Sequence, residues 1–282
     1  MVDAITTVIE KYQRRLINMP YVPATTYGRA ALGKDGVANE LFLTFLFSDK
    51  EQSNLNFMEV MILTYDIVRR VPAHIIQQGH QFGSKTIADW DQFCREAMLV
   101  YLECCSEKIG GPNKTVEIDE SKFGRRKYHR GHPVKGQWVF GGVERESGKT
   151  FLVPVPDRAA DTLMDVLPVW VEPGTNIISD CWAAYRNLEA HGYTHQTVNH
   201  SIGFADLRTG AHTNTIESTW RHVKAFLNPY NRQTDYLYTL AEYMFHARCR
   251  TQGVDAFNAF IKLAADTDWS AVAPLNDEPG AT

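Results

Sequence analysis

Apolar side chains recur with helical spacing through much of the first hundred residues. One such stripe consists of Phe57, Val60, Met61, Leu63, Ile67 and Val68. A short helix closed by Gly79 is predicted over residues 71–79, and a longer one from Ser84, which can cap it, through Leu102. Residues 1–110 are therefore predicted to form a mostly helical N-terminal region. Three helices with tight connections fit a helix-turn-helix DNA-binding unit and, equally, a plain helical bundle.

After a turn-rich segment at residues 107–114, short apolar runs with strand character take over. Strands are predicted at residues 115–119, 137–143, 150–155, 175–180 and 196–198. Helices are predicted at residues 158–170 and 182–190, and a third begins near residues 212–214. The resulting order, βββαβαβα, predicts an α/β domain over residues 112–252. A C-terminal helix and a frayed tail are expected over residues 253–282.

The composition is that of a soluble globular protein, with 44% apolar and 22% charged residues. No apolar run approaches the ~18–20 residues needed to cross a bilayer, and the N-terminus lacks the pattern of a secretory signal. The five cysteines form no Cys-x-x-Cys pair, so neither a zinc site nor a disulfide framework is indicated. We therefore expect no membrane partner and an intracellular location, in the cytoplasm or nucleoid of a bacterium or the nucleus of a eukaryote.

Three carboxylates occupy positions that a fold can bring together. Asp119 and Asp180 each end a predicted strand, and Glu217 lies one turn into a predicted helix. Carboxylate oxygens are the ligands that hard divalent cations prefer, and two such ions can assist in-line displacement at a phosphodiester. The pattern thus predicts metal-dependent phosphoryl transfer on nucleic acid. Two simpler interpretations stay open, namely that Asp180 caps a helix and that Glu217 forms an intrahelical pair with Arg221.

Two further acids flank Asp119 in the same strand. Strand alternation puts Glu117 on the same face as Asp119 and Glu120 on the opposite one. Glu117 is therefore a possible extra metal ligand, and Glu120 is expected to be a supporting acid.

Basic residues are concentrated where a DNA backbone would lie, although the net charge of the chain is −4. Residues 121–135 contain no acid and six cations, which are Lys122, Arg125, Arg126, Lys127, Arg130 and Lys135. Arg221 and Lys224 share a helical stripe with Asn214 and Glu217. These eight cations are candidate phosphate contacts. The alternative is that the basic segment is a solvated loop.

Three segments together resemble the DDE transposases of the Merlin and ISXO-like insertion-sequence type. They are Val116-Glu117-Ile118-Asp119-Glu120-Ser121-Lys122-Phe123-Gly124, then Ile178-Ser179-Asp180, then Gly210-Ala211-His212-Thr213-Asn214-Thr215-Ile216-Glu217-Ser218-Thr219-Trp220 with Lys224. The 36 residues between Asp180 and Glu217 are typical of that family. The resemblance covers about residues 112–250.

The resemblance implies an RNase H-like catalytic core in which Asp119, Asp180 and Glu217 are the catalytic and metal-binding triad. It implies two Mg²⁺ or Mn²⁺ ions, with Asn214 as a fallback ligand, while His200 and His212 would orient DNA or the carboxylates. The implied activity is cleavage and strand transfer at transposon ends. The implied partner is double-stranded DNA, both the terminal inverted repeats and the target, bound by a homodimer or higher oligomer.

One departure from the family concerns the N-terminus. Many relatives have a zinc ribbon there, whereas this chain has no cysteine before Cys94. Recognition of the terminal repeats would then fall to the helical region. Two other functions remain open on the sequence, a domesticated DNA-binding protein that no longer cuts and a stand-alone nuclease of the same fold.

Overall fold

The computed structural model describes residues 55, 57–105, 107–124, 136–180, 183–185, 187–198, 212–227 and 236–266. The chain divides into two units, one of residues 105–254 and one that joins residues 1–104 to residues 255–282. The first unit contains the strands, and the second is helical in the part that is described.

A mixed five-stranded sheet forms the centre of the first unit. Its strands are β2 (Thr115–Phe123), β3 (Gln137–Glu144), β4 (Thr150–Val155), β6 (Asn176–Asp180) and β7 (Thr194–Val198). They lie in the order β4-β3-β2-β6-β7. The first three pair antiparallel, and β6 and β7 extend the sheet in parallel from β2. This is the strand order of an RNase H-like fold, as the sequence predicted.

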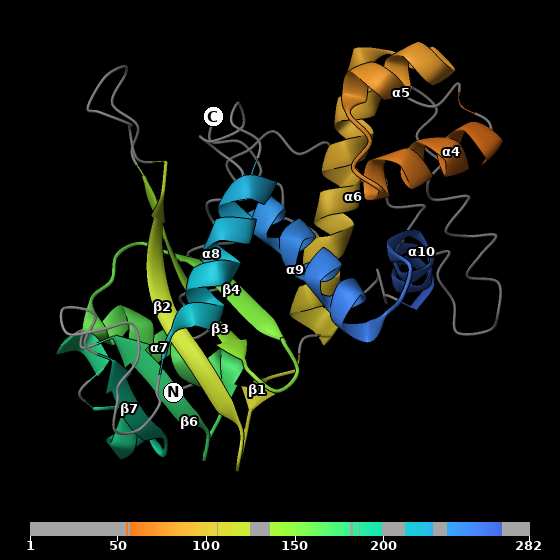
Figure 1. The fold of residues 1–282 in the computed structure, drawn as a ribbon. Coiled ribbons are helices and arrows are strands. Elements are labelled where there is room, and N and C mark those ends of the chain that lie inside the picture. The colour runs from red at the N-terminus through yellow and green to blue at the C-terminus, as the bar shows by residue number, and fades with distance from the viewer. Residues whose placement is uncertain are drawn as a thin grey trace, which may run out of the picture. The chain divides into compact units, whose positions relative to one another are not determined.

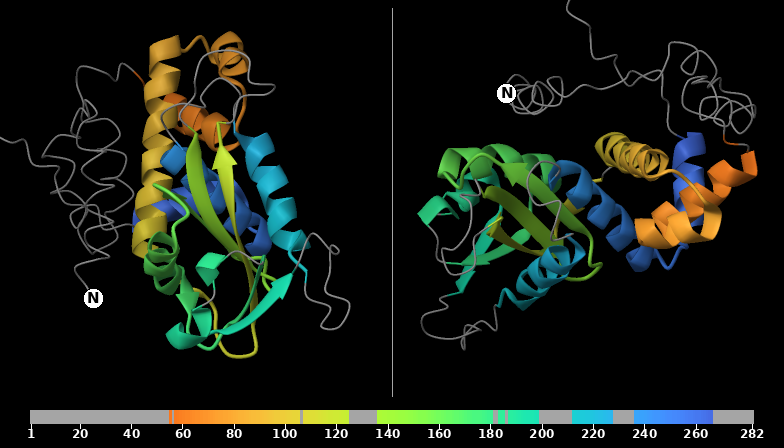
Figure 2. Two further views of the ribbon diagram at one scale, coloured as in Figure 1. Left: turned by 90° about the vertical axis from the view of Figure 1, so that its left-hand side faces the viewer. Right: turned by 90° about the horizontal axis from the view of Figure 1, so that it is seen from above.

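Helices cover both faces of this sheet (Figure 1). Helix α7 (Ala160–Trp170) packs on one face, where Val116 and Ile118 of β2 share a buried core with Leu163 and Leu167. Helix α8 (Asn214–Phe226) packs on the other face, against β2 and β3. Helix α9 (Tyr236–Gln252) lies beside α8 against β4, as the further views show (Figure 2).

Period-two alternation in β2 explains why the two faces differ. The even-numbered Val116 and Ile118 are fully buried in the apolar core under α7. The odd-numbered Glu117, Asp119 and Phe123 all contact α8. Because side chains alternate strictly along a strand, Glu117 and Asp119 both lie under α8.

The structure differs from the prediction between β6 and β7. We expected a helix over residues 182–190, but the described residues there form two short 3₁₀ turns, η2 (Ala183–Tyr185) and η3 (Leu188–His191). The backbone of Asn187 is not helical, and Gly192 closes the second turn in the left-handed conformation, which glycine adopts without a steric penalty. A short parallel pair, β1 (Ile109–Gly110) with β5 (Val171–Glu172), was also not predicted.

The described part of the helical unit contains α4 (Phe57–Val68), α5 (Ala73–His80), α6 (Ser84–Cys105) and α10 (Ala256–Asp266). These match the predicted helices. The indole of Trp90 donates to Thr64 across α4 and α6 at 2.9 Å, and Tyr65 meets Phe257 of α10 edge-on. Among the described helices, none is both long and apolar enough to cross a membrane. The expected frayed tail lies outside the described residues.

The contact between α8 and the sheet depends on a small residue in β3. Gly141 pairs with Asp119, and a Cβ added there would lie 2.7 Å from the Trp220 ring and 2.9 Å from Leu152. Neither neighbour is a flexible chain end that can move away cheaply, since Trp220 is 5% exposed and Leu152 is 1% exposed. Gly141 therefore lets the indole of α8 lie directly on the strands.

Replacing Gly141 with alanine is expected to destabilise the protein by roughly 1–3 kcal/mol, the usual cost of overpacking a core. Gly79→Ala is the control, because it lies in α5 with nothing within 4 Å of the added carbon. That change should be neutral or stabilise by roughly 0.5–1 kcal/mol. Chemical denaturation of both variants would test this, and equal midpoints would contradict it.

Candidate active site

The register of the sheet brings the two aspartates to neighbouring positions. The last pair in the parallel ladder between β2 and β6 joins Glu117 to Ile178. Asp119 and Asp180 each lie two residues further along, so they occupy the same face of adjacent strands. Both side chains are partly exposed.

The third acid, Glu217, is carried to this face by α8. It lies in the first turn of the helix, where the Thr213 hydroxyl donates to its Oε1 at 3.2 Å. One turn later, the Trp220 indole donates from Nε1 to Oδ2 of Asp119 at 2.9 Å. Residues three apart share a helix face, so the bond from Trp220 turns Glu217 toward the aspartates.

The charges of the three acids affect one another. The pKa of Asp119 is raised from 3.8 to about 6, chiefly because burial disfavours its charged form. The hydrogen bonds from the Glu120 backbone and from Trp220 oppose this rise, while the charges of Asp180 and Glu217 add to it. The structure therefore brings together the three acids that the sequence singled out.

Glu120 extends this acidic group from the opposite face of β2. Burial and the charges of Asp119 and Asp180 raise its pKa from 4.5 to about 8, against a lowering contribution from Arg158. Its Oε1 is buried and has no hydrogen-bond partner among the described residues. Glu120 is therefore mostly protonated at neutral pH.

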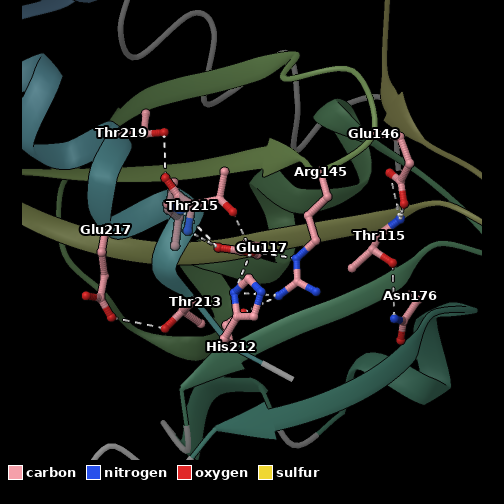
Figure 3. A network of polar contacts seen from close by, with 11 residues as sticks. Thr115, Glu117, Arg145, Glu146, Asn176, His212, Thr213, Thr215, Glu217 and Thr219 are labelled. Atoms are coloured by element: carbon pink, nitrogen blue, oxygen red, sulfur yellow. Dashed lines mark hydrogen bonds and ion pairs between the residues drawn. The ribbon is translucent and has the colours of Figure 1, made fainter. Parts of the chain in front are cut away.

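The surroundings of Glu117 differ from those of the metal ligand that the sequence suggested. Its side chain is fully buried, and it accepts hydrogen bonds from Arg145, from the Thr215 hydroxyl and from the backbone amides of Thr215 and Ile216 (Figure 3). Both carboxylate oxygens are thus occupied at the start of α8. The suggestion that Glu117 is an extra metal ligand is wrong for this geometry.

The donor set of Asp119, Asp180 and Glu217 suits a divalent cation. All three side chains offer carboxylate oxygens, and the repulsion that raises the pKa of Asp119 is of the kind that a cation between them would relieve. Over the described ranges, no three His, Cys, Asp or Glu side chains stand close enough to hold an ion as they are. Any binding would therefore draw the carboxylates together.

The described cations of the predicted DNA surface lie on β2 and α8. Lys122 and Arg158 both stack over the Trp138 ring, at 5.3 and 5.1 Å from its centroid. Lys224 stacks over Phe123, and Arg221 is exposed on α8, as is Asn214 at its start. The other candidates lie outside the described residues and are Arg125, Arg126, Lys127, Arg130, Lys135 and His200.

Comparison with known proteins finds a family model that is similar to most of the first unit. Residues 109–246 match the family model described as the ISXO2-like transposase domain. This segment is therefore similar to a transposase domain. The match includes Asp119, Asp180 and Glu217 and all the strands of the five-stranded sheet.

A transposase-like protein of uncharacterised function from Haemophilus influenzae is 29% identical over 83 residues, which are 29% of this chain. The match spans 66% of the length of that relative. Among solved structures, the HTLV-2 integrase catalytic core in complex with magnesium is 18% identical, with a TM-score of 0.32, over 48% of this chain and 86% of that one. The BIV integrase core is 14% identical, with a TM-score of 0.28, over 54% and 80% of the two chains.

Some contacts in the first unit could not be predicted from the sequence. Arg145 follows β3 in a turn-like run and carried no signal, yet its guanidinium binds Glu117 at 2.6 Å and also contacts His212. Arg158 and Trp138 are far apart in sequence and meet only because β3 and β4 pair. Trp220 is buried, and its bond to Asp119 could be seen only in the structure.

The raised pKa values predict how stability depends on pH in metal-free buffer. Asp119 holds more of its proton in the folded than in the unfolded chain between pH 3.8 and about pH 6. Glu120 does so between pH 4.5 and about pH 8. Stability should therefore fall as the pH rises through these ranges, by about 1.4 kcal/mol per unit of pKa shift. Glu120→Gln should flatten the decline between pH 5 and 8, measured by denaturation in EDTA.

The exposed Glu172 provides the control for that measurement. Glu172→Gln should leave the slope of stability against pH as it is in the wild type. A Glu120→Gln variant with the wild-type slope would mean that Glu120 is ionised in the folded protein, contrary to the geometry.

Proposed function

We propose that this protein is a DNA transposase that cleaves the ends of a transposon and joins them to target DNA. The observation that carries the proposal is the arrangement of Asp119, Asp180 and Glu217. The two aspartates lie on one face of adjacent strands, and Glu217 lies on α8, whose Trp220 binds Asp119. Two strands and a helix of a transposase domain supply these acids.

In this proposal the three carboxylates form one metal-binding and catalytic group. Two bound Mg²⁺ or Mn²⁺ ions would activate the nucleophile and stabilise the charge on the attacking and leaving oxygens. Trp220 holds Oδ2 of Asp119 and so fixes the direction of its other oxygen. Water first hydrolyses a phosphodiester at the transposon end, and the 3′-hydroxyl that is released then attacks a target phosphodiester at the same carboxylates.

The DNA backbone is expected to follow the cations around this group. Lys122 lies three residues beyond Asp119 in β2, and Arg221 and Lys224 lie one and two turns beyond Glu217 in α8. These positions lie on β2 and α8, two of the three elements that carry the acids. We also propose that the protein acts as a homodimer or higher oligomer on double-stranded terminal repeats.

The helical unit is proposed to recognise the terminal repeats. Helices α5 and α6 are separated only by residues 81–83, a turn in which Gln81 adopts the left-handed conformation and Phe82 is buried. A connection of this length is typical of helix-turn-helix units. The start of α6, with Lys85 exposed, would then be the part that enters the major groove.

The chemistry is tested by Asp180→Asn, which keeps the size of the side chain and removes its charge. We expect Mg²⁺-dependent nicking and strand transfer on DNA with the element's own ends to fall by about 100-fold or more, the order seen when a group acting on the transition state is lost. DNA binding in EDTA should not change. Asn caps helices about as well as Asp. Equal cleavage by the wild type and Asp180→Asn would therefore mean that Asp180 has only a capping role.

The outcome for the wild type separates the other two functions. Cleavage without strand transfer would indicate a stand-alone nuclease. Binding without cleavage would indicate a domesticated DNA-binding protein.

The proposed DNA surface is tested by the salt dependence of binding. Lys224→Ala should reduce the slope of log K against log salt by about 0.9, the value for one lost phosphate contact, and the triple variant with Lys122→Ala and Arg221→Ala by about three times as much. Arg250→Ala is the matched control, because Arg250 also stacks over an aromatic ring, that of Tyr243, but on α9. An unchanged slope in the triple variant would remove this surface from the proposal.

A further inference from the structure

The Glu117 carboxylate is fully buried and is surrounded by donors (Figure 3). Its Oε1 accepts from Arg145 Nε at 2.6 Å and from the Thr215 hydroxyl at 2.8 Å. Its Oε2 accepts from the backbone amides of Thr215 and Ile216, both at 2.9 Å. A charge this deeply buried is tolerated only when it is paired and hydrogen-bonded, so this carboxylate is held in one place.

These bonds replace the cap that α8 lacks. The first four amides of a helix have no partner within it, and a side chain at the N-cap usually satisfies one of them. Thr213 is the N-cap of α8 and makes no such bond with its side chain. A residue of β2, 98 positions earlier than Thr215, does so instead. The start of the helix is therefore attached to the sheet.

Strand β2 thus holds α8 at two points. Glu117 binds the amides of Thr215 and Ile216, and Asp119, two residues further on, binds the indole of Trp220. Glu217 lies between these points on the helix. The two attachments fix how far α8 can slide along β2 and how far it can rotate, and they therefore fix the position of Glu217 relative to Asp119.

Arg145 completes the arrangement from the end of β3. Its backbone amide donates to the Thr115 carbonyl at 2.9 Å, and its guanidinium binds Glu117 and the backbone carbonyl of His212. The same group contacts Nδ1 of His212 at 3.0 Å. Arg145 thereby fixes the residue that leads into α8.

We infer that Glu117 and Arg145 are positioning residues that place Glu217 against Asp119 for metal binding. The inference rests on the proposed function. Neither side chain touches the reacting atoms, since both oxygens of Glu117 and the guanidinium of Arg145 are engaged with α8 and its approach. Glu117 thus positions α8, whereas Asp119, two residues later, binds the metal ions that act on the substrate.

The chain contains a matched control for this role. Glu144 is 1% exposed and, like Glu117, accepts from a backbone amide, that of Gly110, and from a cation, Lys114. It lies in β3 opposite Val116 and has no contact with α8 among its described partners. Loss of either acid should destabilise the fold, but only Glu117 should affect Glu217.

The experiment compares Glu117→Gln and Glu144→Gln in the full chain. Thermal unfolding measures their stability, and isothermal titration calorimetry with Mn²⁺ measures metal binding at a temperature well below both unfolding midpoints. Both variants should unfold at lower temperature. Glu117→Gln should weaken Mn²⁺ binding at least about tenfold, as is usual when the partners of metal ligands are removed, and Glu144→Gln should leave it within about twofold. Asp119→Asn should abolish the same binding. If Glu117→Gln does not fold, Arg145→Lys, which keeps the charge but not the planar fork, takes its place.

Equal Mn²⁺ affinity in Glu117→Gln and Glu144→Gln would overturn the inference and leave Glu117 with a purely structural role. Hydrogen exchange of the amides of residues 214–217 gives a readout without metal. If the wild type binds no Mn²⁺, the proposed function fails. In that case, faster exchange in Glu117→Gln but not in Glu144→Gln would still support the positioning of α8, and unchanged exchange would overturn it.

Discussion

The attachment of α8 to the sheet through the buried Glu117 carboxylate is the constraint on which the rest of the site depends. Sheet and helix are far apart in sequence, and the apolar contacts between them are non-directional. Trp220 and Ile216 would pack nearly as well after a small slide or rotation of the helix. Two backbone amides, a hydroxyl and a guanidinium converging on one carboxylate permit one arrangement. Directional polar contacts thus set the position that hydrophobic packing leaves loose.

This constraint holds together groups that would otherwise separate. Asp119, Asp180 and Glu217 repel one another, and burial adds to the cost of charging Asp119. A site of this kind lowers stability in the absence of a cation, so the surrounding structure must offset it. The apolar core under α7 and the bonds at Glu117 do this on opposite faces of the same strand. Stability and function are therefore placed on different residues of β2.

Sequence reasoning reached the elements and the acids but not the contacts between them. Strand ends and helix starts carry local signals, so Asp119, Asp180 and Glu217 could be identified. The sequence of strands along the chain followed from the periodicity of apolar residues, whereas their order in the sheet came from the structure. Alternation also put Glu117 on the face of Asp119, but it could not show that the start of α8 lies above Glu117 while Asp119 stays partly exposed beside Trp220. The error at residues 182–190 has a similar origin, since a suitable composition does not reveal where the backbone leaves helical geometry at Asn187.

Strand β2 shows why these residue types must follow one another so closely. From Glu117 onward, alternate side chains anchor a helix, supply a carboxylate and support an indole through Phe123. Between them, Glu120 and Lys122 face the other side, toward Arg158 and Trp138. A slip of one residue in the pairing with β3 would exchange the two sets, and it would put the Glu117 charge into the apolar core under α7. The burial of Glu117 therefore favours the register that keeps Asp119 on the face of β2 covered by α8.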